Sequence, residues 1–460
     1  MALNLTGQIM NDQTPRPSLD PSGKATRIDL FSVRSAPMRA FHVTWLSFFV
    51  CFFAWFGVAP LMKVIRGELG LTNQQIKNTI IASVAITVFA RLAVGWLCDK
   101  FGPRLTYTWL LLLGSLPVIG VGFAHSYQTF LLFRLAIGVI GASFVITQTH
   151  TSLMFAPNVV GTANATTAGW GNLGGGVTQM VMPLVFGAFM ALGVGEYFSW
   201  RLSMVAAGAV CLLAALAYYK LTQDTPLGNY QELRRRGQLP SFKAVKGGFT
   251  AACKDPRVWS LFIIYGACFG IELTINNIAA LYFSDNFGLG LAAAGLVASL
   301  FGLMNIFART LGGFFGDRFG NKYGLRGRVR WLFAAVFTEG LALVLFSRMT
   351  LLPMAIGSLI LFSLFVQMSE GATYSVVPFV NKNALGAISG IVGAGGNFGA
   401  VSAGFLLKGF GSWSNGLLLL GGLVTLVSFA AFLVRFPEAD SEAEQQPALR
   451  EAADAEPVTA

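Results

Sequence analysis

Long apolar segments alternate with short polar ones along most of this chain. Six lie before a polar stretch at residues 221–257 and six lie after it. A helix needs about 20 apolar residues to cross the hydrocarbon core, whereas barrel strands alternate in segments of about ten. The pattern therefore predicts an all-α membrane protein with twelve spans. The predicted spans are 43–65, 75–97, 105–124, 128–150, 163–192, 200–220, 258–283, 291–312, 329–347, 351–375, 386–408 and 414–436.

The segments outside these spans set the expected domain organisation. Residues 1–40 form a polar tail that lacks the apolar core of a cleaved signal peptide. Residues 41–221 and 258–436 form two six-helix bundles, joined by a linker at 222–257. Residues 437–460 are acidic and alanine-rich, which predicts a disordered tail.

Composition excludes several classes of protein. Hydrophobic residues make up 54% of the 460 positions and charged residues only 12%, against about 25% charged residues in soluble domains. This excludes a soluble enzyme and a disordered chain. The five cysteines are scattered without a CxxC pair, which favours buried apolar residues over metal ligands or disulfides. We expect neither a metal nor a cofactor.

The net charge of +11 is explained by topology. If both termini are cytoplasmic, 23 of the 32 Lys and Arg residues flank the spans on the inside and six lie outside. Cytoplasmic loops carry such an excess, so the basic balance indicates a multi-pass protein of the cytoplasmic (inner) membrane rather than a nucleic-acid partner. The remaining three, Arg91, Arg134 and Arg309, lie in the interior of spans rather than at their ends.

The two bundles carry matching motifs. Arg91, Gly95 and Asp99 recur 218 residues later as Arg309, Gly313 and Asp317, each set closing the second span of its half. Gly171-Asn172-Leu-Gly174 recurs 225 residues later as Gly396-Asn397-Phe-Gly399. Two independent pairs at similar offsets indicate parallel six-span repeats related by an axis along the membrane normal.

These motifs resemble those of a known family. Gly95-x-x-x-Asp99-x-x-Gly102-x-Arg104 resembles the loop motif of the major facilitator superfamily, with a weaker copy at Gly313 to Gly320. Ala168 to Gly176 and Gly393 to Gly399 resemble the paired signature of its nitrate/nitrite porter family. The run from Glu370 to Pro378 looks closest to the high-affinity nitrate-uptake branch. The resemblance covers about residues 40–436.

The two repeated arginines are the main candidates for substrate binding. Each lies eight residues above its aspartate, about 12 Å into the membrane. A mid-membrane arginine costs at least about 2.5–3.5 kcal/mol and stays charged. The planar guanidinium fork matches a planar oxyanion. We expect Arg91 and Arg309 to clamp one monovalent anion. The alternative is an ion pair with Glu272, Glu339 or Glu370, which the twofold arrangement disfavours.

Other candidates surround this pair. Asn172 and Asn397 are expected to line the anion site, or only to pack. The small residues beside them allow close helix contacts: Gly169, Gly171, Gly174, Gly393, Gly396 and Gly399. The resemblance implies that Phe144, Tyr265 and Phe269 cover or touch the anion. Arg134 is interpreted as a structural partner for backbone carbonyls or a neighbouring span.

The loop motifs predict a latch at the cytoplasmic ends of the helices. It comprises Gly95, Asp99, Arg104, Gly313, Asp317 and Arg318. Intramembrane acids often mark proton relays, so Glu272 and Glu370 are candidates for proton coupling, with His150 a lesser one. Either acid is equally expected as an ion-pair partner.

Together these observations predict a transporter and no enzyme. The expected function is alternating-access transport of nitrate, and of nitrite, by a monomer in the lipid bilayer, coupled to proton symport or to nitrite exchange. One alternative is a superfamily exchanger of an organic acid or phosphate ester, although a dianion favours more cationic groups. A remote alternative is a transporter-like nitrate sensor. No GxxxxGK[ST], HExxH or GxSxG motif is present.

Overall fold

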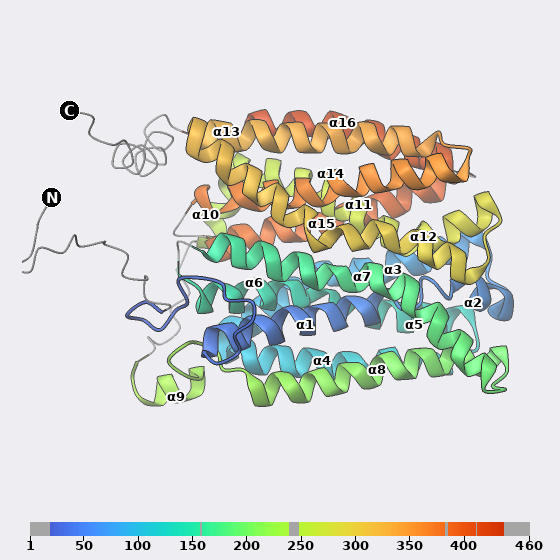
Figure 1. The fold of residues 1–460 in the computed structure, drawn as a ribbon, viewed down its shortest axis with the longest axis horizontal. Coiled ribbons are helices and arrows are strands. Elements are labelled where there is room, and N and C mark those ends of the chain that lie inside the picture. Colours follow the sequence, from blue (N-terminus) through green and yellow to red (C-terminus); the bar gives the residue numbers. More distant parts are fainter. Residues whose placement is uncertain (1–18, 157–158, 239–247, 382–384, 411, 437–460) are drawn as a thin grey trace, which may run out of the picture.

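The computed structural model is an all-helical bundle (Figure 1). It describes residues 19–156, 159–238, 248–381, 385–410 and 412–436. Among these residues, twelve helices are long and apolar enough to cross a membrane. They are Ala36–Phe56, Asn73–Gly95, Pro103–Phe123, Tyr127–Met154, Thr162–Ala191, Glu196–Leu221, Pro256–Phe287, Leu291–Gly320, Lys322–Ser347, Leu352–Val376, Gly390–Gly409 and Trp413–Leu433. The predicted fold class is confirmed.

The helices of these spans are labelled in chain order, with α2, α9 and α10 lying between spans. Their bounds are α1 Ala36–Phe56, α2 Met62–Leu69, α3 Asn73–Phe101, α4 Pro103–Gly120, α5 Tyr127–Ile137, α6 Ser143–Met154, α7 Val160–Ala191, α8 Glu196–Leu221, α9 Tyr230–Arg235, α10 Gly248–Lys254, α11 Pro256–Phe287, α12 Leu291–Leu303, α13 Ala308–Ser347, α14 Leu352–Val376, α15 Leu385–Gly409 and α16 Trp413–Val427. Short 3₁₀ turns form part of the third, fourth, eighth and twelfth spans.

Local sequence signals explain several helix ends. Thr72 and Gln75 form a reciprocal capping box at the start of α3, which satisfies two backbone donors that the helix leaves unpaired. Inside α13, Gly324 adopts φ 64°, a left-handed conformation that favours glycine. This break turns the chain from the eighth span into the ninth.

Some element boundaries differ from the sequence prediction. The first span begins at Ala36, capped by the Ser35 hydroxyl, inside the segment predicted as a polar tail. The predicted linker contains α9 and α10. A serine cap followed by proline at position 37 is a standard helix start. The first turn of this helix has low hydropathy, so a search for apolar segments does not include it.

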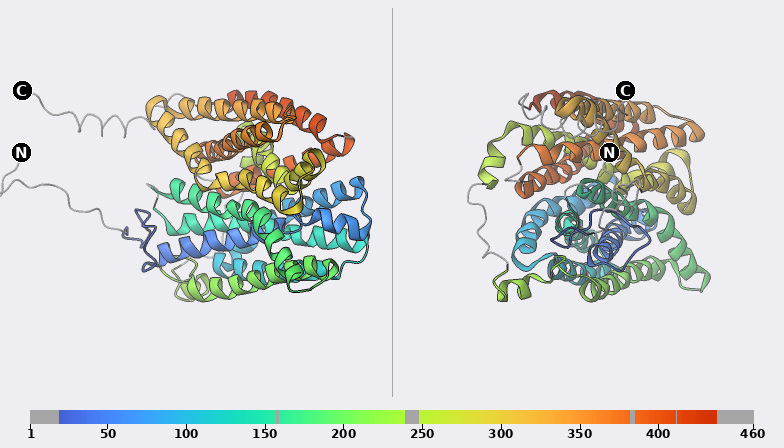
Figure 2. Two further views of the ribbon diagram at one scale, coloured as in Figure 1. Left: turned by 45° about the vertical axis from the view of Figure 1, so that its right-hand side comes forward. Right: turned by 60° about the vertical axis from the view of Figure 1, so that its left-hand side comes forward.

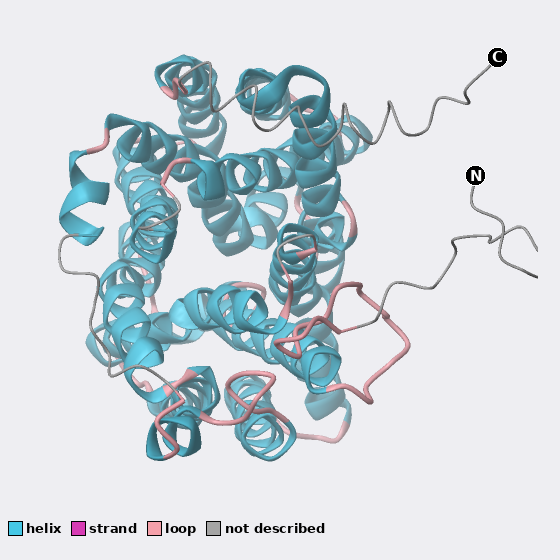
Figure 3. Cartoon of the chain, turned by 90° about the vertical axis from the view of Figure 1, so that its left-hand side faces the viewer, coloured by secondary structure: helices cyan, strands magenta, loops and turns pink. Residues whose placement is uncertain are grey.

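The helices form two groups, α1–α8 and α11–α16, stacked against each other in Figures 1 and 2. Across the boundary, α3 packs against α15 and α7 packs against α12. The bundle seen along its helices (Figure 3) consists of helices and loops alone in its described part. We call the end that carries α9 and α10 the linker end and the end that carries α2 the distal end (Figure 1).

Glycines allow the two groups to approach closely. A methyl group at Gly176 of α7 would lie 2.6 Å from Gly302 Cα of α12. Within the second group, a methyl group at Gly399 of α15 would lie 2.1 Å from Gly266 O of α11. Real side-chain carbons do not tolerate such distances, so these contacts require glycine.

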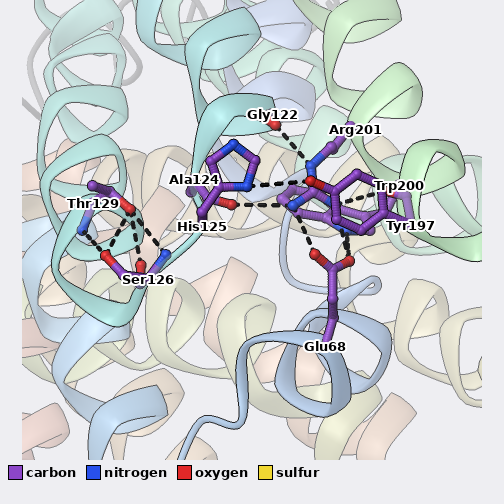
Figure 4. Close-up of polar contacts among 9 residues, drawn as sticks. All are labelled: Glu68, Gly122, Ala124, His125, Ser126, Thr129, Tyr197, Trp200 and Arg201. Atoms are coloured by element: carbon purple, nitrogen blue, oxygen red, sulfur yellow. Dashed lines mark hydrogen bonds and ion pairs between the residues drawn. The ribbon is translucent and has the colours of Figure 1, made fainter.

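At the distal end, Glu68 anchors α2 to α8 (Figure 4). Its Oε1 accepts a hydrogen bond from Arg201 Nη2 at 2.7 Å, and its Oε2 accepts from Arg201 Nη1 at 2.9 Å and from Trp200 Nε1 at 2.6 Å. The Arg201 guanidinium also lies 3.8 Å from the centroid of the Tyr197 ring. Such a bidentate pair fixes geometry as well as charge, so α2 is held rigidly beside the bundle.

Candidate functional site

The two repeated arginines lie against the same pair of aromatic rings. Arg91 of α3 has its Cζ 5.1 Å from the centroid of Phe144 and 5.2 Å from that of Phe269. For Arg309 of α13 the corresponding distances are 5.8 and 6.0 Å. Phe144 belongs to α6 and Phe269 to α11, and their ring centroids are 6.1 Å apart. The structure therefore gathers two buried cations from opposite halves around one aromatic pair.

Arg91 is bonded to neutral partners on the opposite half. Its Nη1 donates to the carbonyl oxygen of Gly393 on α15. With the Asn397 amide turned so that its oxygen faces the guanidinium, that oxygen accepts from Arg91 Nη1 at 3.1 Å and from Nε at 2.9 Å. The Nη2 group is buried without a partner among the described residues. The positive charge of Arg91 is therefore not compensated by a bonded carboxylate, and its Nη2 group remains free to donate a hydrogen bond inside the bundle.

Arg309 has a charged partner. Its Nη1 donates to Glu370 Oε2 of α14 in an ion pair that is buried on both sides, and its Nη2 donates to the Tyr265 hydroxyl at 2.9 Å. The expectation that the twofold arrangement disfavours an ion pair is wrong at this arginine. The physical reason is that the two halves differ in their acids: the first five spans contain no Asp or Glu, whereas the described part of the second half contains three buried glutamates.

Asn172 and Asn397 occupy matching positions in the repeats but meet different partners. Asn172 Nδ2 of α7 donates to Glu272 Oε2 at 3.0 Å. The other oxygen of Glu272 accepts from Asn305 Nδ2 at 2.8 Å and from Gln367 Nε2 at 3.3 Å. Three amide donors thus surround Glu272, and one of them comes from the opposite half. Asn397 approaches Arg91 instead.

The aromatic residues predicted around the anion lie together. Tyr265 stacks on Phe269 with centroids 5.2 Å apart. Tyr374 of α14 adds a fourth ring, 5.0 Å from Tyr265 and 5.8 Å from Phe144. The sequence reasoning missed Tyr374, although it lies one helical turn after Glu370 and hence on the same face. It also missed Asn305 and Gln367.

The signature glycines separate into two roles. Gly171, Gly174, Gly396 and Gly399 lie where an added methyl group would meet neighbouring atoms within 2.3 Å. A methyl group at Gly169 would be 2.9 Å from the Asn305 carbonyl oxygen and 3.5 Å from Arg309 Cβ, whereas one at Gly393 would be 3.3 Å from the Tyr374 hydroxyl and 3.6 Å from Arg91 Nη1. Gly169 and the first four glycines therefore let helices touch, and Gly393 leaves space beside the Arg91 guanidinium group.

Comparison with known proteins agrees with this architecture. Residues 44–379 and 274–458 match the model of the Major Facilitator Superfamily. High affinity nitrate transporter 2.5 of Arabidopsis thaliana is 40% identical over 426 residues, which cover 91% of this chain and 84% of that protein. The chain belongs to the nitrate/nitrite porter family of this superfamily.

Further relatives and structures extend the comparison. Nitrate transporter 2.1 of Chlamydomonas reinhardtii is 35% identical over 430 residues, or 91% of this chain and 78% of the relative. Nitrate/nitrite transporter NrtP of Nostoc punctiforme is 28% identical over 432 residues, or 79% and 85%. A bacterial homologue of the human lysosomal transporter Spinster matches in fold with a TM-score of 0.63 at 15% identity, over 93% of this chain and 100% of that one. The family consists of transporters rather than enzymes, as the sequence predicted.

The loop motif of this porter is held by Asp224. Gly102 has φ 86°, and a methyl group there would lie 2.4 Å from the Asp224 carboxyl group. Asp224 Oδ1 accepts from the Arg104 backbone N–H at 2.8 Å, and Oδ2 accepts from the Tyr230 backbone N–H at 2.9 Å. Burial raises the pKa of the Asp224 carboxyl, while these N–H donors oppose that shift. The loop is thereby fixed to the end of α8 and the start of α9.

The predicted latch is only partly visible. The side chains of Asp99 and Asp317 lie outside the described residues. The Arg104 side chain bonds the Tyr219 carbonyl oxygen at 2.8 Å, and Arg318 is exposed. A methyl group at Gly95 would lie 3.7 Å from Val145, and one at Gly313 would lie 3.9 Å from Ala165 of the opposite half. The latch therefore stays a prediction.

Arg134 and His150 form their hydrogen bonds with residues other than those around the aromatic pair. Arg134 donates to the Trp55 carbonyl oxygen at 3.3 Å and to Asn277 Oδ1 of α11 at 3.0 Å, which confirms its interpretation as a structural partner. His150 Nδ1 contacts the Tyr218 hydroxyl, and its Nε2 lies 2.8 Å from the Gln223 carbonyl oxygen. These partners account for His150 as a structural residue.

The two halves are tied together at the distal end. Arg66 of α2 pairs with Asp285 of α11 at 3.3 Å. Lys77 of α3 donates to the carbonyl oxygens of Leu407 and Phe410, each at 2.8 Å, where α15 ends. With Arg134 bonded to Asn277, three cations of the first half therefore hold the second half in this state.

Replacing Tyr265 by phenylalanine should weaken the apparent affinity for nitrate about tenfold or more. The change removes the oxygen that accepts from Arg309 Nη2 and leaves the ring in place, and a buried hydrogen bond to a charged group contributes about 1.5–3 kcal/mol. The KM of nitrate uptake measures this effect. Tyr323→Phe, at an exposed tyrosine, is the matched control, and an unchanged KM in Tyr265→Phe would contradict the prediction.

Replacing Asn172 by alanine should lower turnover about fivefold or more and change KM little. The amide bonds Glu272 across the two halves and not an arginine, so its loss affects the rearrangement of the halves. Initial uptake rates over a range of nitrate concentrations separate the two parameters. Asn172→Ser, which retains a small donor, should recover part of the rate. An increase in KM without a loss of turnover would place Asn172 on the anion instead.

Proposed function

We propose that this protein carries nitrate, with nitrite as a second substrate, across the cytoplasmic membrane by alternating access between its two halves. The linker end faces the cytoplasm, as the distribution of 23 inside against six outside cations predicts. Relatives that are named as nitrate or nitrate/nitrite transporters support the substrate. The distal contacts of Arg66, Lys77 and Arg134 then close the outer side in this state.

The observation that carries the proposal is the pair of buried arginines on one aromatic pair. Arg91 and Arg309 are each only 2% exposed, and they come from opposite halves. Two like charges in a low-dielectric interior repel each other, and Arg91 has no carboxylate partner among the described residues. An anion between them offsets that repulsion, and it can accept from the free Nη2 of Arg91.

The charges around the site favour one monovalent anion. Arg91 and Arg309 contribute two positive charges, while Glu370 and Glu272 contribute two negative charges when both are ionised. A nitrate would then leave one uncompensated negative charge, and the penalty for such a charge in the interior is several kcal/mol. One proton on Glu370 removes the excess and releases Arg309 Nη1 from its ion pair. We therefore infer that a proton accompanies each nitrate.

Exchange of nitrate for nitrite is the second candidate. It is favoured by Glu272, whose two carboxyl oxygens already accept hydrogen bonds from three amide donors. In an exchanger the arginine pair is never empty during turnover, because one monovalent anion replaces another. Glu370 would then serve only to hold Arg309 between anions.

Purified protein in proteoliposomes distinguishes these mechanisms. Nitrate uptake is followed under an imposed inward proton gradient, and separately with internal nitrite and no gradient. Symport predicts accumulation with the gradient alone, whereas exchange predicts uptake only with internal nitrite. Tight nitrate binding without flux in either arrangement would contradict transport and favour the sensor. Uptake of phosphate esters or organic acids but not nitrate would contradict the substrate.

A further inference from the structure

Glu339 is a third intramembrane acid that the anion site does not use. It lies in the ninth span, on the part of α13 that follows the break at Gly324, and it is fully buried. Neither of its carboxyl oxygens has a hydrogen-bond partner among the described residues. Glu370, by contrast, pairs with Arg309, and Glu272 accepts from three amides.

A buried carboxylate without a partner is strongly disfavoured. Leaving an ionised group unpaired in the interior costs several kcal/mol, and the group avoids this cost by binding a proton. Arg309 offers Glu370 a positive charge, whereas Glu339 has no hydrogen-bond partner among the described residues. The surroundings of Glu339 therefore favour its neutral, proton-holding form.

Two further buried polar atoms on α14, near these acids, have no hydrogen-bond partner among the described residues. The Ser369 hydroxyl of α14 lies close enough to interact with the Glu339 carboxyl, yet it has no hydrogen-bond partner in the described structure. Glu370 follows Ser369 in the chain, and its Oε1, the oxygen not used by Arg309, is also buried and unpartnered. Glu339 and Glu370 are within electrostatic range of each other. Ser369 thus interacts with Glu339 and directly precedes in the chain the acid that pairs with Arg309.

Few other charged or titratable groups face Glu339. From α14 these are Glu370 and, through it, Arg309, and from α11 the thiol of Cys268. The helix α16 and the 3₁₀ turn Ser428–Leu433, which also pack against α13, contain no titratable residue. Arg309 is the only cation among these groups, and it pairs with Glu370 rather than with Glu339.

We propose that Glu339 is the proton-binding site that supplies Glu370 during nitrate transport, with Ser369 as the connecting hydroxyl. The O–H bond of the Glu339 carboxyl breaks, Ser369 Oγ accepts that proton, and the Ser369 hydroxyl proton passes to Glu370 Oε1. The negative charge moves from Glu370 to Glu339, and Arg309 is released for the incoming anion. Glu339 regains its proton from the aqueous side from which the anion enters. The inference rests on the proposed symport.

The experiment compares Glu339→Gln, Glu339→Asp and Ser369→Ala with wild type in proteoliposomes. Glutamine matches the shape of the neutral acid but releases no proton. Two assays are run on each variant: nitrate uptake driven by an inward proton gradient, and nitrate self-exchange at equal pH on both sides. Glu196→Gln, at an exposed glutamate of the distal end, is the matched control. Nitrate-dependent thermal stabilisation of each purified variant shows that it is folded and binds the anion.

In Glu339→Gln, the rate of gradient-driven uptake should fall at least about tenfold, while the rate of self-exchange should stay near that of the wild type. The rate of gradient-driven uptake in Ser369→Ala should be intermediate, and Glu339→Asp should be partly active. Full gradient-driven uptake in Glu339→Gln would overturn the role of Glu339 while leaving nitrate symport intact. Loss of both assays in a folded, nitrate-binding variant would overturn it too, because Glu339 would then serve rearrangement rather than protons. Wild-type protein that requires internal nitrite would overturn the inference together with symport, but not the anion site.

Discussion

Arg91→Lys should reduce nitrate uptake at least about 100-fold. Lysine keeps the positive charge but lacks the planar fork that bonds Gly393 O and the Asn397 amide and leaves Nη2 free for the anion. Two or more charge-assisted hydrogen bonds are lost, each contributing about 1.5–3 kcal/mol, and about 1.4 kcal/mol corresponds to a factor of ten. Initial uptake rates in proteoliposomes, normalised to the reconstituted protein, measure the change.

Two further variants sharpen this test. Arg309→Lys should have a comparable effect, because the proposed clamp uses one arginine from each half. Arg348→Lys, at an exposed arginine after the ninth span, should leave uptake near wild type and controls for the substitution itself. Intact uptake kinetics in Arg91→Lys would contradict the arginine clamp.

In Glu370→Gln, the rate of proton-driven nitrate uptake should fall about tenfold or more, and the rate should no longer depend on pH. The glutamine carbonyl can still accept from Arg309 Nη1, so the arginine stays in place, but the side chain cannot bind a proton. In the wild type, protonation of Glu370 breaks the ion pair with Arg309, so lower external pH should raise uptake. In the variant, the rate should be the same across that pH range.

Self-exchange of nitrate without a gradient distinguishes lost coupling from lost binding. Glu370→Gln should retain self-exchange, because the anion still meets both arginines. Glu196→Gln, at the distal surface, should behave like wild type in both assays. A Glu370→Gln variant whose uptake stays fully pH-responsive would exclude Glu370 as a proton carrier.

The repeat made much of this site predictable. The sequence separation between Arg91 and Arg309 is nearly equal to that between the two Gly-Asn motifs. Matching positions in the two halves could therefore be aligned without a structure. A shared position in two parallel repeats implies a shared height and a shared orientation toward the boundary between the halves. This is why the two arginines are found together, whereas the aromatic residues Phe144 and Phe269 were expected there from the family resemblance and not from the repeat.

The partners of these residues could not be predicted from the repeat, because the repeats differ there. Asn172 and Asn397 share a signature, yet one bonds Glu272 and the other approaches Arg91. Acids occur within the spans of the second half and are absent from the first five spans, and this asymmetry decides which amide meets a carboxylate.

Contacts between remote segments were also beyond the sequence. Arg66 and Asp285 are 219 residues apart, and Lys77 bonds the end of α15 through two backbone carbonyls that carry no sequence signal. Such contacts exist only once the packing of the two halves is set. Helical periodicity places Tyr374 on the same face as Glu370, so its position could have been predicted. A single tyrosine among many aromatic residues, however, gives no indication of a site.

A high-resolution structure of the protein at saturating nitrate tests the central claim most directly. The account predicts one planar anion between Arg91 and Arg309, bonded to Arg91 Nη2 and covered by the rings of Phe144 and Phe269, with Arg309 Nη1 no longer paired with Glu370. An anion bound elsewhere, or bound to one arginine while the other keeps its present partners, would contradict it.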